Sequence, residues 1–106
     1  MTFHVKTLPK AEADIRSITT YIHKRSPRGA AAWVNAYERA RKRLTETADG
    51  CGEADENEFL DIDVKQSLFK TRHGRVYRLL FTIVDDEARI LRVRGSGQAP
   101  VEPDDL

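Results

Sequence analysis

The fold is decided by residues 75–94, which read RVYRLLFTIVDDEARILRVR. Arg75–Val84 and Glu87–Arg94 are both rich in the aromatic and branched apolar residues that favour strands. Asp85 and Asp86 lie between them and are typical of a tight two-residue turn. The stretch therefore predicts two long antiparallel strands joined by that turn.

A third strand is predicted just before this pair. Residues 67–72 alternate apolar and polar side chains, and His73-Gly74 is typical of a turn. At the other end of the chain, residues 3–7 alternate in the same way and end at Pro9, which suits the first turn of a helix. A strand therefore precedes the first helix, and three strands follow one another at the end of the chain.

Two helices are predicted between the first strand and the last three. Apolar residues recur at helical spacing, with Ala11, Ile15, Ile18 and Ile22 in the first helix and Ala30, Trp33, Val34, Tyr37, Ala40 and Leu44 in the second. Ser26 followed by Pro27 indicates a capping residue and the first residue of the second helix. So short a connection predicts an antiparallel helix hairpin, with Trp33 and Tyr37 in the core.

The predicted fold class is α+β, with the order β-α-α-β-β-β and the helix hairpin packed on one face of a small, largely antiparallel sheet. The 106 residues suffice for a single domain, residues 1–106. Residues 49–63 carry seven acids and no base, and we expect an acidic loop that is mobile, its end held by Phe59, Leu60 and Ile62. Residues 95–106 form a C-terminal tail.

Composition points to a cytoplasmic protein. No apolar run reaches the ~18–20 residues that span a bilayer, and the first residues lack the apolar segment of a secretory signal. Cys51 is the single cysteine, so no internal disulfide can form, and a reducing compartment is the natural one. We therefore expect no membrane association.

Strand parity gathers cations on one face of the predicted sheet. Tyr77, Leu79, Phe81 and Ile83 share a face with Phe69, Leu91 and Val93, and we expect this face to pack on the helices. The opposite face then carries Leu80, Ile90 and five cations, namely Lys70, Arg72, Arg78, Arg92 and Arg94, with Arg75 nearby. Like charges on adjacent strands repel, so the cluster indicates an anionic partner. A nucleic acid, an acidic peptide or a solvated face without a partner all remain open.

Other site chemistries have weaker support in the sequence. His4, His23 and His73 lie in different elements without the spacing of metal ligands, and we expect no metal and no cofactor. His73 is the histidine that borders the basic strands. Gly95-Ser96-Gly97 lacks the lysine and helix start of a phosphate-binding loop.

Two sets of motifs resemble the RelE/ParE superfamily of toxins. Leu8-Pro9-Lys10-Ala11-Glu12-Ala13-Asp14-Ile15 followed by Tyr21-Ile22 is similar to the family's entry into its first helix, although Leu8 replaces the usual capping Thr or Ser. Tyr77-Arg78-Leu79-Leu80-Phe81, the acidic turn, and Ile90-Leu91-Arg92-Val93 resemble its closing strands. Their order and spacing cover nearly the whole chain apart from the acidic loop and the tail.

The resemblance implies the toxin of a type II toxin–antitoxin system of the plasmid stabilisation type, partnered by an antitoxin in a hetero-oligomer. RelE-like toxins cleave messenger RNA on the ribosome, whereas ParE-like toxins inhibit DNA gyrase without a known hydrolytic step. Arg78 matches the RelE arginine that contacts the scissile phosphate, and Lys70 matches a lysine of the preceding strand. No Tyr or His follows Arg94, where RelE-like enzymes carry further catalytic groups.

A missing acid or base group typically costs ~10²–10⁴ in rate, so the ParE-like branch is favoured, and we expect no enzymatic activity. The alternative is a ribosome-dependent endoribonuclease that uses Lys70, Arg72, Arg78 and Arg92. A second alternative is a non-toxic nucleic-acid-binding or interaction domain. In every case the expected binding residues are Lys70, Arg72, Arg75, Arg78, Arg92 and Arg94.

Overall fold

A computed structural model describes residues 2–58, 60–96 and 98–106. Its main elements are β1 (His4–Thr7), α1 (Pro9–Arg25), α2 (Pro27–Thr47), β2 (Lys65–Phe69), β3 (Tyr77–Val84) and β4 (Glu87–Gly95). Short 3₁₀ helices lie at Ala48–Gly50 (η1), Asp55–Glu58 (η2) and Pro103–Asp105 (η3). The predicted α+β class and the order β-α-α-β-β-β are confirmed.

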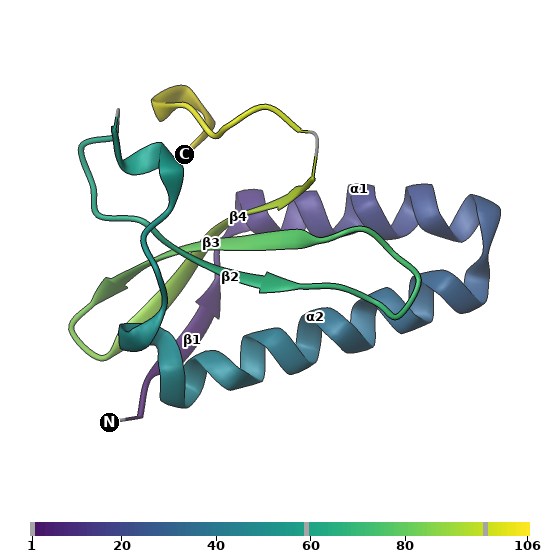
Figure 1. The fold of residues 1–106 in the computed structure, drawn as a ribbon, viewed down its shortest axis with the longest axis horizontal. Helices are drawn as coiled ribbons and strands as arrows, with labels where there is room; N and C mark the ends of the chain where they lie inside the picture. The colour runs from purple at the N-terminus through teal and green to yellow at the C-terminus, as the bar shows by residue number, and fades with distance from the viewer. Residues whose placement is uncertain (1, 59, 97) are drawn as a thin grey trace.

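The strands form one sheet in the order β1-β4-β3-β2. β1 pairs in parallel with β4, and the other two pairings are antiparallel, as the sequence predicted. Figure 1 shows the helix hairpin lying along the sheet, with the α1–α2 turn at the same end of the molecule as the β2–β3 connection. Among the described helices, none has the length and apolar character needed to cross a bilayer.

The helices begin where the sequence predicted. The Oγ atom of Ser26 accepts a hydrogen bond from the Gly29 N–H at 2.9 Å and caps α2, and Pro27 is the first helical residue. At the start of α1, Leu8 supplies no side-chain cap, as expected from an aliphatic residue in that position. The chain therefore turns sharply between the helices, and the hairpin forms.

The main core fills the space between the helix hairpin and the sheet. Trp33 and Tyr37 are buried there, as predicted, and stack on each other with ring centroids 5.8 Å apart. Phe69 and Tyr77 of the sheet complete this aromatic group. Val34 lies beside the buried stripe of α2 and is 39% exposed.

A β-bulge changes the predicted faces of β4. The β3–β4 register shifts between Leu80, which pairs with Arg92, and Phe81, which pairs with Ile90. Leu91 is therefore the extra residue of the bulge. The regular alternation of side chains between the two faces of the sheet does not continue through it. Ile90 lies in the main core and Leu91 on the opposite side, the reverse of the prediction for these two residues, whereas Val93 faces the helices as predicted.

A second layer covers the sheet face opposite the helices, which we call the outer face. The acidic loop and the C-terminal tail fold back over it, and Figure 1 shows them side by side at one end of the sheet. Ala54, Val64, Leu80 and Val101 form a small second core there, against which Leu60 packs. The expectation of a mobile loop is therefore wrong for this part of the chain. Ile62 is 43% exposed, and Phe59 lies outside the described residues.

Candidate functional site

Arg78 on β3 is held by an acid from the acidic loop. Its two terminal nitrogens donate to the two carboxylate oxygens of Glu56 at 2.9 and 2.8 Å, and Gln66 on β2 accepts a further hydrogen bond at 3.1 Å. The Glu56 side chain is fully buried, and that of Arg78 is 21% exposed. Arg78 therefore joins the loop to the sheet.

The same carboxylate also fixes the tail, and its ionisation reflects these contacts. The Val101 N–H donates to Glu56 at 3.1 Å. Burial alone would raise the pKa of Glu56, but the hydrogen bonds from Arg78 and Val101 outweigh it and lower the pKa to about 2. Glu56 is therefore ionised at neutral pH and connects three segments that are distant in the sequence.

Arg92 on β4 is paired in a similar way with Asp14 of α1. Two hydrogen bonds of 2.7 Å join the guanidinium to the carboxylate, and each side chain is 15% exposed. Asp14 also accepts the Val93 N–H at 2.9 Å, beyond the point at which β1 stops pairing with β4. Asp14 thus satisfies a backbone donor on an edge that no strand covers.

Arg94 lies directly opposite Arg78 in the β3–β4 register and is 15% exposed. Its closest acid is Asp105 in the tail, at 3.4 Å, and its Nε atom is buried without a hydrogen-bond partner among the described residues. The backbone oxygen of Asp105 accepts a hydrogen bond from Arg92 at 2.7 Å. The tail therefore covers Arg92 and Arg94 of β4.

These contacts correct the prediction of an exposed basic face. Strand parity predicted the three arginines on one face of the sheet without acids beside them, and the strands indeed place no acidic side chain at those positions. The acids arrive from α1, the loop and the tail, so Arg78, Arg92 and Arg94 are partly buried and compensated. The acid that pairs with Arg78 is Glu56 of the loop. Whether any of the three arginines binds a partner stays a prediction.

The other three predicted binding residues are fully accessible. β2 ends at Phe69, three residues earlier than predicted, so Lys70 and Arg72 lie in the β2–β3 connection with Arg75 and not on a strand. All three side chains are exposed. The ribonuclease candidates Lys70, Arg72, Arg78 and Arg92 are consequently divided between an exposed connection and buried ion pairs.

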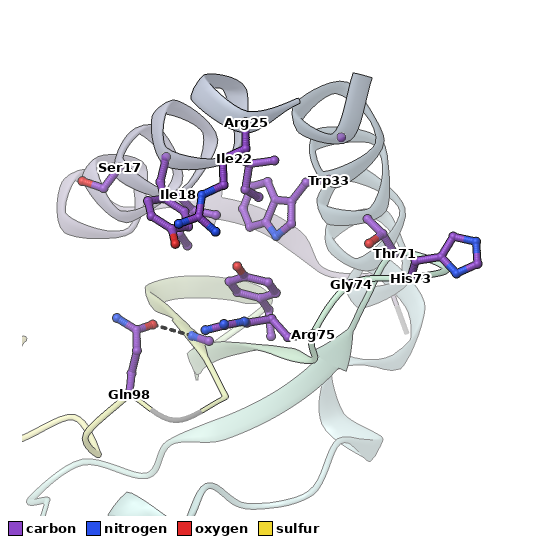
Figure 2. A pocket seen from close by; sticks show the side chains of 14 residues that line it. Ser17, Ile18, Ile22, Arg25, Trp33, Thr71, His73, Gly74, Arg75 and Gln98 are labelled. Atoms are coloured by element: carbon purple, nitrogen blue, oxygen red, sulfur yellow. Dashed lines mark hydrogen bonds between the residues drawn. The ribbon is translucent and has the colours of Figure 1, made fainter. Parts of the chain in front are cut away.

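A cleft of about 650 Å³ opens between this connection and the helix hairpin. Its walls come from α1, α2, the connection and the end of β4, and include Ile18, Tyr21, Arg25, Trp33, Arg75, Tyr77 and Gln98. Figure 2 shows Arg25 directed into the space from above and Arg75 lying along its lower edge toward Gln98, whereas the imidazole of His73 points away. None of the residues that line the cleft is an acid. The cleft can therefore bind an anion through two guanidinium groups.

Several residues of these sites were absent from the sequence prediction. Glu56 and Asp14 were missed because each bonds an arginine 22 or 78 positions away, which no local pattern reveals. Arg25 and Tyr21 could have been found, because both lie one helical turn apart near the hairpin turn; the Arg25 guanidinium stacks over the Tyr21 ring at 4.7 Å. The described residues include no cluster of three metal-ligating side chains.

Comparison with known proteins agrees with the fold and names a family. The family described as the ParE toxin of the type II toxin–antitoxin system, parDE, matches residues 5–100. A solved structure titled "Chromosomal ParDE TA system from P. aeruginosa" superposes with a TM-score of 0.68 at 22% identity, covering 89% of this chain and 96% of the other. Curated proteins give no match. With its family match extending over nearly all of the sequence, the chain belongs to the ParE toxins of type II toxin–antitoxin systems.

Proposed function

We propose that this protein is a cytoplasmic toxin of the plasmid stabilisation type that inhibits DNA gyrase without a hydrolytic step of its own. The family match supports a toxin. One structural observation supports the absence of RNA cleavage. Arg78 and Arg92, which a ribonuclease of the RelE type would need beside a scissile phosphate, are engaged by Glu56 and Asp14.

An electrostatic catalyst must present its charge to the developing charge of the transition state. A guanidinium whose donors are already bonded to a buried carboxylate has little capacity left for a phosphate. Lys70 and Arg72 remain accessible, but residues 95–106 contain neither the Tyr nor the His that would accompany them in a RelE-like enzyme. Binding without cleavage is the function that this arrangement supports best.

The proposal includes a cognate antitoxin that neutralises the toxin in a hetero-oligomer. Three exposed cations of the β2–β3 connection have no ion-pair partner among the described residues, namely Lys70, Arg72 and Arg75. An acidic segment of an antitoxin complements their charge. Such rim charges chiefly raise the association rate and fix the register of a complex. The apolar contacts of the antitoxin then determine how slowly the complex dissociates.

The decisive experiment compares gyrase with translation. Purified toxin is added to gyrase and relaxed plasmid, and the supercoiled product is followed over time, with the antitoxin complex as control. We expect loss of supercoiling that the antitoxin reverses. In parallel, the toxin is added to translating ribosomes, and messenger RNA is mapped for new 5′ ends. Prompt cleavage in the ribosomal A site, with supercoiling unaffected, would overturn the proposal.

A further inference from the structure

Two stretches without acids meet at one end of the molecule. Residues 15–37 contain four bases and no acid, and residues 64–84 contain five bases and no acid. The first stretch includes the α1–α2 turn, and the second includes the β2–β3 connection. Figure 1 shows the turn and the connection at the same end of the molecule. Their bases around the cleft include Arg25 and Arg75, and the exposed Lys24, Arg28, Lys70 and Arg72 lie in the same two segments. This end of the protein therefore attracts anions.

The interior of the cleft is aromatic. Tyr21 is 55% exposed, although large apolar rings are usually covered, and the guanidinium carbon of Arg25 lies 4.7 Å from the centre of its ring. Trp33 and Tyr77 form the inner wall, with their rings at 77° and 5.4 Å apart. The Trp33 Nε1 atom is buried without an oxygen or nitrogen acceptor among the described residues. Figure 2 shows the indole ring turned toward the cavity, beneath Ile22 and Arg25. The cleft thus offers ring faces, cations and a donor together.

We propose that this cleft binds one nucleotide of a single-stranded nucleic acid. The base stacks on Tyr21 at the cleft mouth, and Arg25 and Arg75 hold the flanking phosphate from opposite sides. Single strands are bound in general by aromatic stacking within a basic groove, because every base has a π face and every phosphate a charge. The volume of about 650 Å³ lies within the range of small-ligand sites.

A nucleotide suits the cleft better than an acidic peptide does. A docked helix would need a long aliphatic groove, whereas this cleft is compact and its most exposed apolar side chain is the aromatic ring of Tyr21. The lining also includes the polar side chains of Thr71 and Gln98, which can contact the edges of a base, although the Oε1 atom of Gln98 already accepts the Gly95 N–H. The proposed nucleotide site does not depend on the proposed action on gyrase, so either proposal can fail without the other.

The test measures fluorescence anisotropy of labelled eight-residue oligo-dT and oligo-U with the purified protein, in a series of salt concentrations. Tyr21→Ala should weaken binding about tenfold or more through lost stacking, whereas Tyr21→Phe should retain it. The pair Arg25→Ala and Arg75→Ala should lower the slope of log affinity against log salt by roughly one to two. A preference between the two oligonucleotides identifies DNA or RNA as the source.

The matched control removes two exposed cations at the far end of α2, Lys42→Ala and Arg43→Ala. This variant should bind like the parent protein, and thermal melts should show that all four variants are folded. Equal loss in the control, or binding insensitive to Tyr21→Ala, would overturn the proposal in favour of unspecific charge attraction. Displacement by polyglutamate as effective as displacement by oligo-dT, again independent of Tyr21, would identify an acidic peptide site instead.

Discussion

Arg78 and Glu56 form a bidentate ion pair in which the carboxylate has no exposed surface at all. The pair sits on the outer face of the sheet, between the acidic loop and the tail, and the Val101 N–H completes it. Arg78, a cation of β3, is thereby neutralised and largely covered. The loop that carries Glu56 becomes a structural layer of the protein.

Replacing Arg78 should destabilise the fold. Arg78→Ala leaves the carboxylate of Glu56 buried without its counter-charge, and breaking a buried pair from one side typically costs about 3–5 kcal/mol. For a domain of this size that corresponds to a drop in Tm on the order of 10 °C or more. Thermal melts followed by circular dichroism measure it.

The double variant Glu56→Leu with Arg78→Met tests whether the loss comes from the stranded charge. Replacing both partners with apolar residues of similar volume should cost less than the sum of the single changes. An unaltered Tm for Arg78→Ala would mean that the ion pair does not hold the loop in solution.

Acid should loosen the loop and the tail before the main core. The pKa of Glu56 is lowered from 4.5 to about 2. A carboxyl group with a lowered pKa stabilises the fold above its unfolded-state pKa, and the contribution disappears as the pH falls from about 4.5 toward 2. The shift corresponds to stability on the order of 3 kcal/mol at neutral pH.

Urea titrations at pH 7, 4 and 3 measure this loss. Glu56→Gln should remove much of the difference between pH 7 and pH 3. Glu58→Gln is the matched control, because Glu58 lies on the same 3₁₀ helix and is exposed, so its profile should follow that of the parent. Parallel pH profiles for all three proteins would contradict the assignment to Glu56.

The elements that sequence reasoning predicted correctly depend on local signals. Ser26 and Pro27 mark a helix start through their own hydroxyl and ring, and Trp33 and Tyr37 repeat at the helical period. The bulge at Leu91 has no such signal, because one extra residue in β4 is defined only by its pairing with β3. Parity reasoning therefore failed at Ile90 and Leu91 although the strand itself was predicted.

The functional surface was predicted less well, for a related reason. A run of acids reads as a solvated loop and a set of alternating arginines as an exposed face, as long as each is considered within its own segment. Folding brings Glu56 to Arg78 and Asp14 to Arg92, which are far apart in the sequence. Each carboxylate then neutralises the charge of its arginine. Of the six predicted binding residues, those that stay exposed are the three of the β2–β3 connection, Lys70, Arg72 and Arg75.

Asp14 should contribute to stability through the open edge of β4. Asp14→Ala removes both hydrogen bonds to Arg92 and the acceptor of the Val93 N–H, and we expect a loss of about 2–4 kcal/mol. Asp14→Asn keeps an acceptor for the backbone donor without the charge and should lose roughly half as much. Chemical denaturation gives both values. Equal effects of the two variants would show that only the charge matters.

The exposed cations of the β2–β3 connection should act on binding and leave folding unaffected. Lys70→Ala, Arg72→Ala and Arg75→Ala together remove three surface charges that have no ion-pair partner among the described residues. Surface substitutions usually change stability by about 0.5 kcal/mol or less, so the Tm should stay close to that of the parent. Association with the antitoxin should slow, and its dependence on salt should weaken, because steering charges act mainly on the association rate. Stopped-flow mixing at two salt concentrations measures both effects, with the triple variant Arg39→Ala, Lys42→Ala and Arg43→Ala on α2 as the charge-matched control. If the triple variant of the connection associates as fast as this control, the antitoxin does not approach the toxin through the connection.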